Sequence, residues 1–537
     1  MIAVLVDAPP AMPSTSELES FSPVTGERLG AVTAVAPHDI PAVVERAAVV
    51  QRLWAQLRLT DRARYMARAA QAVIDEFDEL AALIVREQGR PRAEAEIMEL
   101  LPAIETLQWL AEAGPGILAG ERIGFSRTQH PVKRGRWTYE PLGVVAVLGP
   151  AAEPLATPLG DVAVALMAGN GVVLKPSPHA PLCGDRIARV FARAGLPEGL
   201  LSVVHGDAEA GAALVEAPVA QVRFTGSTRA GRAVGEACAR GLKRNVLELG
   251  GKDAMLVLAD ANLARAVPGA AWAAFANAGQ CGGSVERALC MREVSERFTE
   301  GVVAAARALR LGDPRDPGTD VGPLVSRDRL DRVRDLVDEA VAGGATLHCG
   351  GPVSLPGLPG PFFAPAVLTG VTASMRLARE EVPGPVLTIE AVGGEDEAIA
   401  RANDSDAGLG ASVWTADRYK GARIARELRT GMVWMNDHLV ARSAPQVPWG
   451  GVRGSGIGRA RGAIALRTCA EPKVVTWDPP IGRTAWWFPY DAALVKAART
   501  VAGLRSARDA DRERALRQGT VPVARVAARW LRSLRRG

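Results

Sequence analysis

Apolar residues recur every three or four positions between residues 38 and 113, with charged residues between them. In the segment DIPAVVERAAVVQRLWAQL, Val43, Ala47, Val50 and Leu53 fall on one side of a helix that begins near Asp39. A period of 3.6 residues is typical of helices that bury one face. The pattern therefore predicts that the N-terminal part of the chain consists mainly of amphipathic helices.

From about residue 143 the pattern changes to short runs of β-branched and aliphatic residues. The runs GVVAVLGP, GVVLKPS, LLSVVHG, QVRFTGS and DAMLVLA each end in or near glycine, proline or serine, and helical segments such as CGDRIARVFARAG separate most of them. Strands that alternate with helices predict βαβ units and a parallel, doubly wound sheet. A second set of such runs lies between residues 285 and 437. The sequence therefore predicts two α/β domains.

The length and composition narrow the class of protein. A chain of 537 residues exceeds one compact core and favours roughly two to four domains. It has no fixed repeat and no apolar run near the roughly 20 residues that cross a bilayer. The N-terminal run MIAVLV has no basic residue before it and is followed by Asp7, so we do not interpret it as a signal peptide.

Six scattered cysteines without C-x-x-C spacing predict no metal site, no disulfide framework and a reducing, cytoplasmic compartment.

The net charge of +5 is unevenly distributed. Residues 483–537 contain 13 Lys and Arg against four acidic residues, a local charge of +9 that leaves −4 on the rest of the chain. Because the basic character belongs to the C-terminal tail, it argues against the whole protein being a nucleic-acid binder.

The last part of this tail predicts a basic amphipathic helix. Val523, Val526, Ala527, Trp530, Leu531 and Leu534 share one face, and Arg525, Arg529, Arg532 and Arg536 occupy the other. Helices of this kind bind anionic membrane surfaces or acidic partners. The same pattern is equally typical of a helix that docks on its own subunit. Both alternatives stay open.

Two predicted strand ends carry groups suited to a phosphate or a dinucleotide. Lys175-Pro176-Ser177 follows the run GVVL, and FTGSTRAG (224–231) joins a glycine turn to the start of a helix. Ligands of open α/β sheets bind beyond the carboxyl ends of the strands, and a helix N-terminus can face a pyrophosphate. The spacing of these glycines differs from the usual G-x-G-x-x-G, so on its own it is more typical of an ordinary helix start.

A thiol at Cys281 lies in the stretch NAGQCGGSVER (277–287). An amide precedes it, two glycines follow it and a Glu-Arg pair comes shortly after. Enzymes keep reactive cysteines in polar, glycine-rich settings of this kind. Cys281 is therefore a candidate nucleophile.

Nine motifs occur in one collinear order: FSPVTGERLG (21–30), EPLGVVAVLGP (140–150), TPLGDVAVALMAGNGVVLKPS (157–177), FTGSTRAG (224–231), LELGGKDAMLV (247–257), NAGQ with SVER (277–287), EEVPGPVL (380–387), VWMNDH (433–438) and PWGGVRGSGIGR (448–459). Together they resemble the NAD(P)-dependent aldehyde dehydrogenase family over about residues 20–478. The resemblance implies an α/β fold of two doubly wound domains with a β-flap.

Domain bounds follow from the same resemblance. It implies a dinucleotide-binding domain at 1–120 and 142–249, a catalytic domain at 250–467 and an oligomerisation flap at 121–141 and 468–480. The flap would pair subunits into a homodimer or homotetramer. The basic tail at 481–537 extends beyond the family's usual end.

The implied chemistry is oxidation of a small-molecule aldehyde to a carboxylic acid with NAD or NADP. A thiolate adds to the aldehyde, an Asn amide and a backbone N–H hold the oxyanion, and a Glu-activated water hydrolyses the thioester. Glu248 stands at the position of the base. The implied cofactor contacts are Lys175, Ser177, Gly226, Ser227 and Glu381. Pro178 replaces the Glu that NAD-preferring members often carry, which leaves NAD and NADP as alternatives.

Departures from the family pattern cluster at the reacting centre. The segment PAAEP (150–154) puts Ala152 where the family has the oxyanion Asn, and Pro383 replaces a phenylalanine near the nicotinamide ribose. The family pattern G-Q-x-C-x-x-x-E-R puts Gly282 at the nucleophile position, and the usual spacing of 34 residues from the base at Glu248 gives the same residue. Cys281 is thus the neighbour of the nucleophile position, and in an extended segment it would point away from the nicotinamide.

Two hypotheses on activity follow. In the first, the chain is a working aldehyde dehydrogenase in which the flexible Gly282-Gly283 pair lets Cys281 swing inward. In the second, the chain has lost thioester chemistry and keeps dinucleotide binding. It would then act as a subunit partner, a scaffold or a weak hydrolase that uses Glu248 directly.

Overall fold

The structure is a computed structural model that describes residues 16–126, 130, 132–439, 444–478, 480, 484 and 487–534. It contains two compact units. One comprises the described residues up to Ala119 and Tyr139–Glu471, and the other comprises Gly120–Thr138 and the described residues from Pro472 on.

The first unit begins with a β-hairpin and a group of helices. Strands β1 (Glu17–Phe21) and β2 (Arg28–Thr33) pair antiparallel. The helices predicted between residues 38 and 113 are present as η1 (Pro37–Asp39), α1 (Ile40–Trp54), α2 (Leu59–Asp75), α3 (Phe77–Gln88), α4 (Arg92–Ala95), the π-helical turn η2 (Glu96–Leu100) and α5 (Leu101–Leu118). Val43 and Ala47 are buried as expected, whereas Leu53 is exposed.

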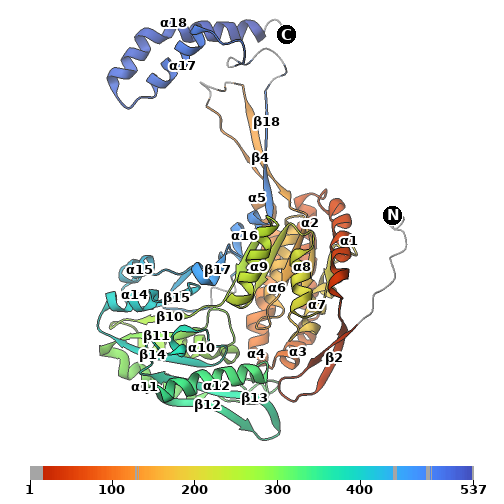
Figure 1. Ribbon diagram of the computed structural model, residues 1–537, viewed down its shortest axis with the longest axis vertical. Helices are drawn as coiled ribbons and strands as arrows, with labels where there is room; N and C mark the ends of the chain where they lie inside the picture. The colour runs from red at the N-terminus through yellow and green to blue at the C-terminus, as the bar shows by residue number, and fades with distance from the viewer. Residues whose placement is uncertain are drawn as a thin grey trace. The chain divides into compact units, whose positions relative to one another are not determined.

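A six-stranded sheet follows, in the order β17-β9-β8-β5-β6-β7. Its strands are β5 (Val144–Leu148), β6 (Gly171–Lys175), β7 (Leu201–Val203), β8 (Gln221–Thr225), β9 (Arg244–Glu248) and β17 (Gly456–Ile457). All neighbours are parallel except β17, which pairs antiparallel with β9. The accompanying helices are α6 (Ala156–Met167), α7 (Pro181–Arg193), α8 (Ala208–Glu216), α9 (Thr228–Arg240) and α16 (Gly462–Thr468). Figure 1 shows α6 to α9 gathered beside the N-terminal helices.

A seven-stranded sheet forms the other half of this unit, in the order β12-β13-β14-β11-β10-β15-β16. Its strands are β10 (Asp253–Val257), β11 (Val285–Met291), β12 (Thr346–Leu355), β13 (Leu358–Thr369), β14 (Val386–Val392), β15 (Gly410–Trp414) and β16 (Met432–Met435). Only β12 runs antiparallel to its neighbour within this sheet, as the structure describes it. The helices and turns are α10 (Leu263–Phe275), η3 (Ala276–Gly279), α11 (Arg292–Ala308), α12 (Arg327–Ala342), α13 (Arg376–Arg379), α14 (Glu395–Asn403), α15 (Arg418–Glu427) and η5 (Arg453–Ser455).

The apolar runs of the sequence become the central strands of these sheets. Every residue of β5, β6, β10 and β15 is buried, because helices cover both faces of each sheet. The predicted α/β fold with two doubly wound domains is confirmed. Strand β17 and helix α16 return to the first sheet from a segment predicted to be catalytic domain. The exact domain bounds stay a prediction.

The second unit contains a small sheet and a helical hairpin. The sheet has the order β18-β4-β3, with β3 (Glu121–Arg122), β4 (Arg134–Pro141) and β18 (Ala470–Trp477). It corresponds to the predicted flap, and the ends of β4 and β18 belong to the first unit. The tail folds into α17 (Ala492–Leu504) and α18 (Asp509–Leu534). No helix of the described residues is both long and apolar enough to cross a membrane.

The topology brings the candidate residues to one region. Lys175 and Glu248 end parallel strands of the first sheet, and Gly226 directly follows a third. Gly282 and Glu381 precede β11 and β14, which are parallel strands of the second sheet. The chain crosses from Glu248 at the end of β9 to Asp253 at the start of β10 within five residues. The carboxyl edge of the first sheet therefore meets the amino edge of the second.

Asn170 generates a prediction about the stability of the first sheet. Its fully buried side chain accepts hydrogen bonds from Leu142 N and Gly143 N and donates to the carbonyls of Ala165 and Cys469. Asn170→Ala leaves these buried groups without partners, so we expect a loss of about 2–5 kcal/mol in the free energy of unfolding, measured by denaturant titration. Asn262→Ala, at an exposed helix cap, should cost only about 1 kcal/mol. Equal losses would contradict the role of Asn170.

Candidate functional site

Glu248 is a buried carboxyl at the end of β9. Its Oε2 accepts a hydrogen bond of 3.0 Å from the Thr225 hydroxyl, and its Oε1 has no hydrogen-bond partner among the described residues. The pKa of Glu248 is raised to about 7, mainly by burial and then by the charge of Asp161, while Arg461 and Arg223 oppose the rise. A carboxyl with this pKa is divided between acid and base at neutral pH, which suits proton transfer.

A buried ion pair lies next to this carboxyl. Arg223 Nε donates to Asp161 Oδ1 at 2.8 Å, and Arg223 Nη2 donates to the carbonyl of Ala460 at 2.9 Å. A cavity of about 10 Å³ is lined by Glu248, Asp161, Arg461 and Trp109, together with smaller residues. This volume is near the minimum for one water molecule. The space beside Glu248 therefore has room for about one water.

The loop before β11 has an unusual backbone. Asn277 and Ala278 have φ of 52° and 51°, in the left-handed region that non-glycine residues rarely adopt. Gly279 and Gly283 are also left-handed, at 70° and 89°. Such conformations persist only where the surroundings fix them.

The Arg90 guanidinium fixes this loop. Its Nε donates to Asn277 Oδ1 at 3.1 Å, and its Nη2 donates to the carbonyl of Ala152 at 2.7 Å. Its Nη1 lies 3.3 Å from Glu99 Oε1, and both of these side chains are fully buried. Asn277 N in turn donates to Glu94 at 2.8 Å. One buried cation thus connects the loop after β5 with the loop before β11.

Cys281 points into an apolar cluster. The cluster contains Cys281, Leu409, Met432, Trp434, Leu439 and Trp449. The thiol is 7 % exposed, and its Sγ lies 3.8 Å from the carbonyl oxygen of Ala276. Burial raises the pKa of this thiol to about 12. In this conformation Cys281 is protonated at neutral pH, and a protonated thiol is a poor nucleophile.

Gly282 is half-buried and borders open space. A Cβ atom added to Gly282 would meet no atom within 4 Å, and its φ lies outside the left-handed region. The position of the next residue, Gly283, is fixed by a hydrogen bond, in which His438 Nε2 donates to its carbonyl oxygen at 2.8 Å. Burial lowers the pKa of His438 to about 4, so this imidazole is neutral. The Cβ atom of a residue at position 282 would therefore fit without moving its neighbours.

The predicted cofactor residues lie along the edges of the two sheets. Lys175 is buried, and burial lowers its pKa to about 8, with Asp207 opposing the change. Ser177 Oγ accepts from His179 N at 3.2 Å. Ser227 caps α9 by accepting from Ala230 N at 3.3 Å. A Cβ added to Gly226 would lie 2.6 Å from the Phe224 ring, so a larger residue in this turn would have to displace that ring.

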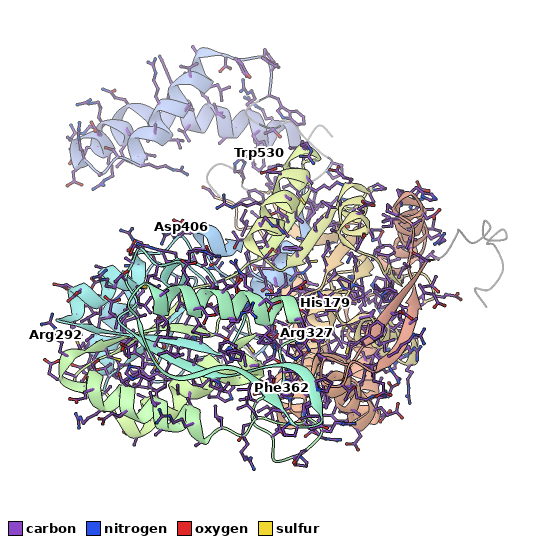
Figure 2. The ribbon with its side chains drawn as sticks, turned by 60° about the horizontal axis from the view of Figure 1, so that its bottom comes forward. His179, Arg292, Arg327, Phe362, Asp406 and Trp530 are labelled. Carbon is purple, nitrogen blue, oxygen red and sulfur yellow. The ribbon has the colours of Figure 1, made fainter. Side chains whose placement is uncertain are left out.

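A residue after β6 of the first sheet also lies near α12, a helix of the second sheet. Figure 2 shows His179, which follows β6, in the same region as Arg327, the first residue of α12. The charges of Arg329 and Asp328 in the same helical turn are close enough to act on the His179 imidazole.

Glu381 is exposed at the amino edge of the second sheet. Its carboxylate lies directly over Gly250, where an added Cβ would approach Oε2 to 2.0 Å. Next to it, Lys252 Nζ donates to Glu286 Oε2 at 2.6 Å, and the same oxygen accepts from Val382 N at 3.0 Å. This buried ion pair orders the segment that carries Glu381. The glycine turn at 226, the capped helix α9, the ammonium of Lys175 and this carboxylate form a set of groups that fits a dinucleotide.

Comparison with known proteins agrees with this arrangement. The family model described as "Aldehyde dehydrogenase family" matches residues 11–475. The chain belongs to the aldehyde dehydrogenase family. Betaine aldehyde dehydrogenase of Cereibacter sphaeroides is 36 % identical over 454 residues, which cover 84 % of this chain and 92 % of that protein.

Solved structures of aldehyde dehydrogenases have the same fold. The Mycobacterium tuberculosis aldehyde dehydrogenase complexed with NAD+ has a TM-score of 0.82 and 36 % identity, over 87 % of this chain and 95 % of that one. An NADP-dependent enzyme of Escherichia coli has a TM-score of 0.82 and 31 % identity, over 86 % of this chain and 95 % of that one. This aldehyde dehydrogenase is thus an oxidoreductase that oxidises an aldehyde with NAD or NADP.

Several residues of the aldehyde dehydrogenase site were not found from its sequence. They are Arg90, Glu99, Asp161, Arg223, His438 and Arg461. A signal existed for two of them, because Arg223 and Asp161 are charged residues inside apolar runs, QVRFT and LGDVAVAL. Their mutual pairing across 62 positions had no local signal.

The pKa of Glu248 generates a prediction about stability. In the folded protein the pKa of Glu248 is about 7, whereas its ordinary value is 4.5. As the pH rises from 4.5 to 7, the unfolded chain loses its proton first, so the folded state becomes less stable relative to the unfolded state. Glu248→Gln removes this cost. The melting temperature of the variant minus that of the wild type should therefore increase from pH 5 to pH 8, by the equivalent of about 1–3 kcal/mol. A difference that does not change with pH would contradict the raised pKa.

Proposed function

We propose that this aldehyde dehydrogenase oxidises the hydrate of its aldehyde with Glu248 as the base, and forms no thioester on Cys281. One contrast carries the proposal. The Cys281 thiol is buried in an apolar cluster with a pKa of about 12, whereas Glu248 has a pKa of about 7 and an oxygen without a hydrogen-bond partner among the described residues. Gly282, at the family's nucleophile position, has no side chain to react.

The cofactor contacts in this proposal are those of the family. Lys175 and Ser177 hold the adenosine ribose and phosphate, Gly226 and Ser227 face the pyrophosphate, and Glu381 binds the nicotinamide ribose. The close approach of backbone at Gly226 and the capped start of α9 support this arrangement. When bound, the nicotinamide accepts a hydride from the substrate carbon.

In this proposal, groups of the protein accept the proton and position the hydroxyl groups of the substrate. Oxidation of R-CH(OH)₂ to R-COOH transfers the carbon-bound hydrogen as hydride and releases one hydroxyl proton. Glu248 takes this proton, because its Oε1 has no partner among the described residues. In this proposal the diol occupies the space beside Gly282, where an added Cβ would meet no atom within 4 Å. The absence of an amide at Ala152 weakens oxyanion stabilisation, which predicts slow turnover.

The relatives suggest a first substrate to test. Proteins named betaine aldehyde dehydrogenase, from Cereibacter sphaeroides and Brucella anthropi, are 36 % and 35 % identical to this chain. Betaine aldehyde therefore belongs in any panel of aldehydes.

We also propose that the protein is a cytoplasmic homodimer or homotetramer that attaches peripherally to anionic membrane surfaces through its tail. The free thiols of all six cysteines support a reducing compartment. The predicted flap supports subunit pairing, since β18 exposes Val474, Val475 and Trp477. The charge of +9 on residues 483–537 supports the membrane surface.

Dinucleotide binding is predicted to be independent of Cys281. A ligand at 100 times its Kd stabilises a protein by about 2.7 kcal/mol, so saturating NAD+ or NADP+ should raise the melting temperature of both the wild type and Cys281→Ala. Lys175→Ala should reduce the shift. If neither dinucleotide moves the melting curve at millimolar concentration, the cofactor assignment is wrong.

The proposed base and the unused thiol give opposite expectations for activity. Cys281→Ala should leave aldehyde-dependent NAD(P)H formation essentially unchanged. Glu248→Gln should reduce it by about 10²–10⁴, and the wild-type kcat/KM should rise with pH through about 7. No thioester adduct should appear by mass spectrometry. A large loss in Cys281→Ala would show instead that the diglycine loop delivers this thiol.

Restoring the missing groups should increase activity. Gly282→Cys fits the open space, and Ala152→Asn returns the oxyanion amide. We expect the double variant to exceed the product of the single rate gains, because the two groups act on one intermediate. Formation of a thioester in the double variant alone provides the check.

A further inference from the structure

The tail forms a helical hairpin that packs on itself. The loop between α17 and α18 is short, and Arg529 Nη1 contacts Asp491 Oδ2 at 2.7 Å, which connects the end of α18 with the start of α17. The helices approach closely where glycines face small residues. A Cβ added to Gly519 would lie 2.0 Å from Thr500, and one added to Gly503 would lie 2.8 Å from Ala515. Figure 1 shows the two helices running side by side.

This packing covers part of the apolar face predicted from the sequence. Ala515 and Gly519 contact α17, and Val523, Val526 and Trp530 continue the same side of α18 at helical spacing. These three residues are half-buried. Figure 2 labels Trp530 on this helix. These three side chains therefore belong to the contact between α17 and α18. A partner of the tail would bind other residues of α18.

The apolar face of α18 continues beyond the side that packs on α17, about a quarter of a turn further round the helix. Leu516, Ala524, Ala527 and Leu531 follow one another there at spacings of eight, three and four residues and are exposed. Leu516 is 55 % exposed and Leu531 is 53 % exposed. We call these four residues the outer face of α18. In water, exposed leucines on one stripe are unfavourable and mark an interaction site more often than isolated ones do.

Arginines flank this outer face. Arg517 borders the stripe, Arg525 and Arg532 lie further round the helix on the side away from α17, and all three are exposed. Arg525 and Arg532 form no ion pair with other described residues. An aromatic segment, Trp487, Phe488 and Tyr490, precedes the hairpin, and its rings are more than 60 % exposed. Helices that lie at the headgroup level of a bilayer combine three features: a stripe of apolar residues, arginines beside it and exposed aromatic rings.

We propose that the outer face of α18, with the aromatic segment, docks on the surface of an anionic lipid bilayer. This rests on the proposed membrane attachment and assigns the face that makes it. Charge complementarity favours this occupant over a second copy of the hairpin, because each tail carries +9 and two tails would repel. A nucleic acid would use the arginines but would leave the leucines in water.

The test compares variants of the full-length protein in sedimentation with vesicles. Wild-type protein should bind vesicles that contain phosphatidylserine, bind phosphatidylcholine vesicles weakly, and lose binding at high salt. Leu516→Ser with Leu531→Ser should weaken binding at least about tenfold. The matched control, Val495→Ser with Leu504→Ser, replaces exposed apolar residues of α17 and should bind as the wild type does. Arg525→Gln with Arg532→Gln should reduce both affinity and its dependence on salt.

Each outcome decides a separate point. Wild-type protein that sediments with neither kind of vesicle would overturn the membrane attachment. Outer-face variants that bind as well as the wild type would overturn the assignment of the face. A concentration-dependent increase in mass that Leu516→Ser with Leu531→Ser abolishes would show that a second hairpin covers this face instead. Dinucleotide-induced thermal shifts should be unchanged in all variants, so failure here leaves the proposed dehydrogenase function unaffected.

Discussion

The site depends on one buried guanidinium, that of Arg90. It reaches the loop after β5 through the carbonyl of Ala152 and the loop before β11 through Asn277, and Glu99 balances its charge. Glu99 also accepts from Leu155 N and Ala156 N at the start of α6. Removal of this cation would take one charge partner from the buried Glu99 carboxylate and a hydrogen-bond donor from the left-handed loop. The approach of the two sheets is thus controlled by a side chain that contacts no reacting atom.

Much of the fold could be predicted from the sequence because the patterns are local. The five-residue apolar strands and the amphipathic helices follow from spacing, and the candidate base Glu248 and the candidate cofactor residues follow from ordered motifs. What the sequence could not supply is pairing over long distances. The contact of Arg90 with Asn277 spans 187 positions, and that of Arg223 with Asp161 spans 62. The prediction for the tail was partly complete: the amphipathic helix is present as α18, but its packing against α17 could not be read from the sequence.

The departures at the reacting centre have a common physical character. Ala152, Gly282 and Pro383 each stand where the resemblance implies a side chain that contacts the substrate or the cofactor. The loop before β11 has left-handed residues, a contact with Glu94 and a contact with His438. These contacts order the loop without any side chain at position 282. Glu248, by contrast, retains the burial and the neighbouring charges that adjust a carboxyl for proton transfer.

The antiparallel pairing of Gly456 with Glu248 has a consequence for how the protein is made. During synthesis, β9 emerges about 200 residues before β17, its partner at the edge of the first sheet. At typical translation rates of 5–20 residues per second, this edge stays open for on the order of 10–40 seconds. An open edge strand is a template for unwanted pairing with other chains. The strand that carries the carboxyl is therefore exposed to such pairing during synthesis, and a ribosome that stops before residue 456 releases a chain in which β9 has no β17 beside it.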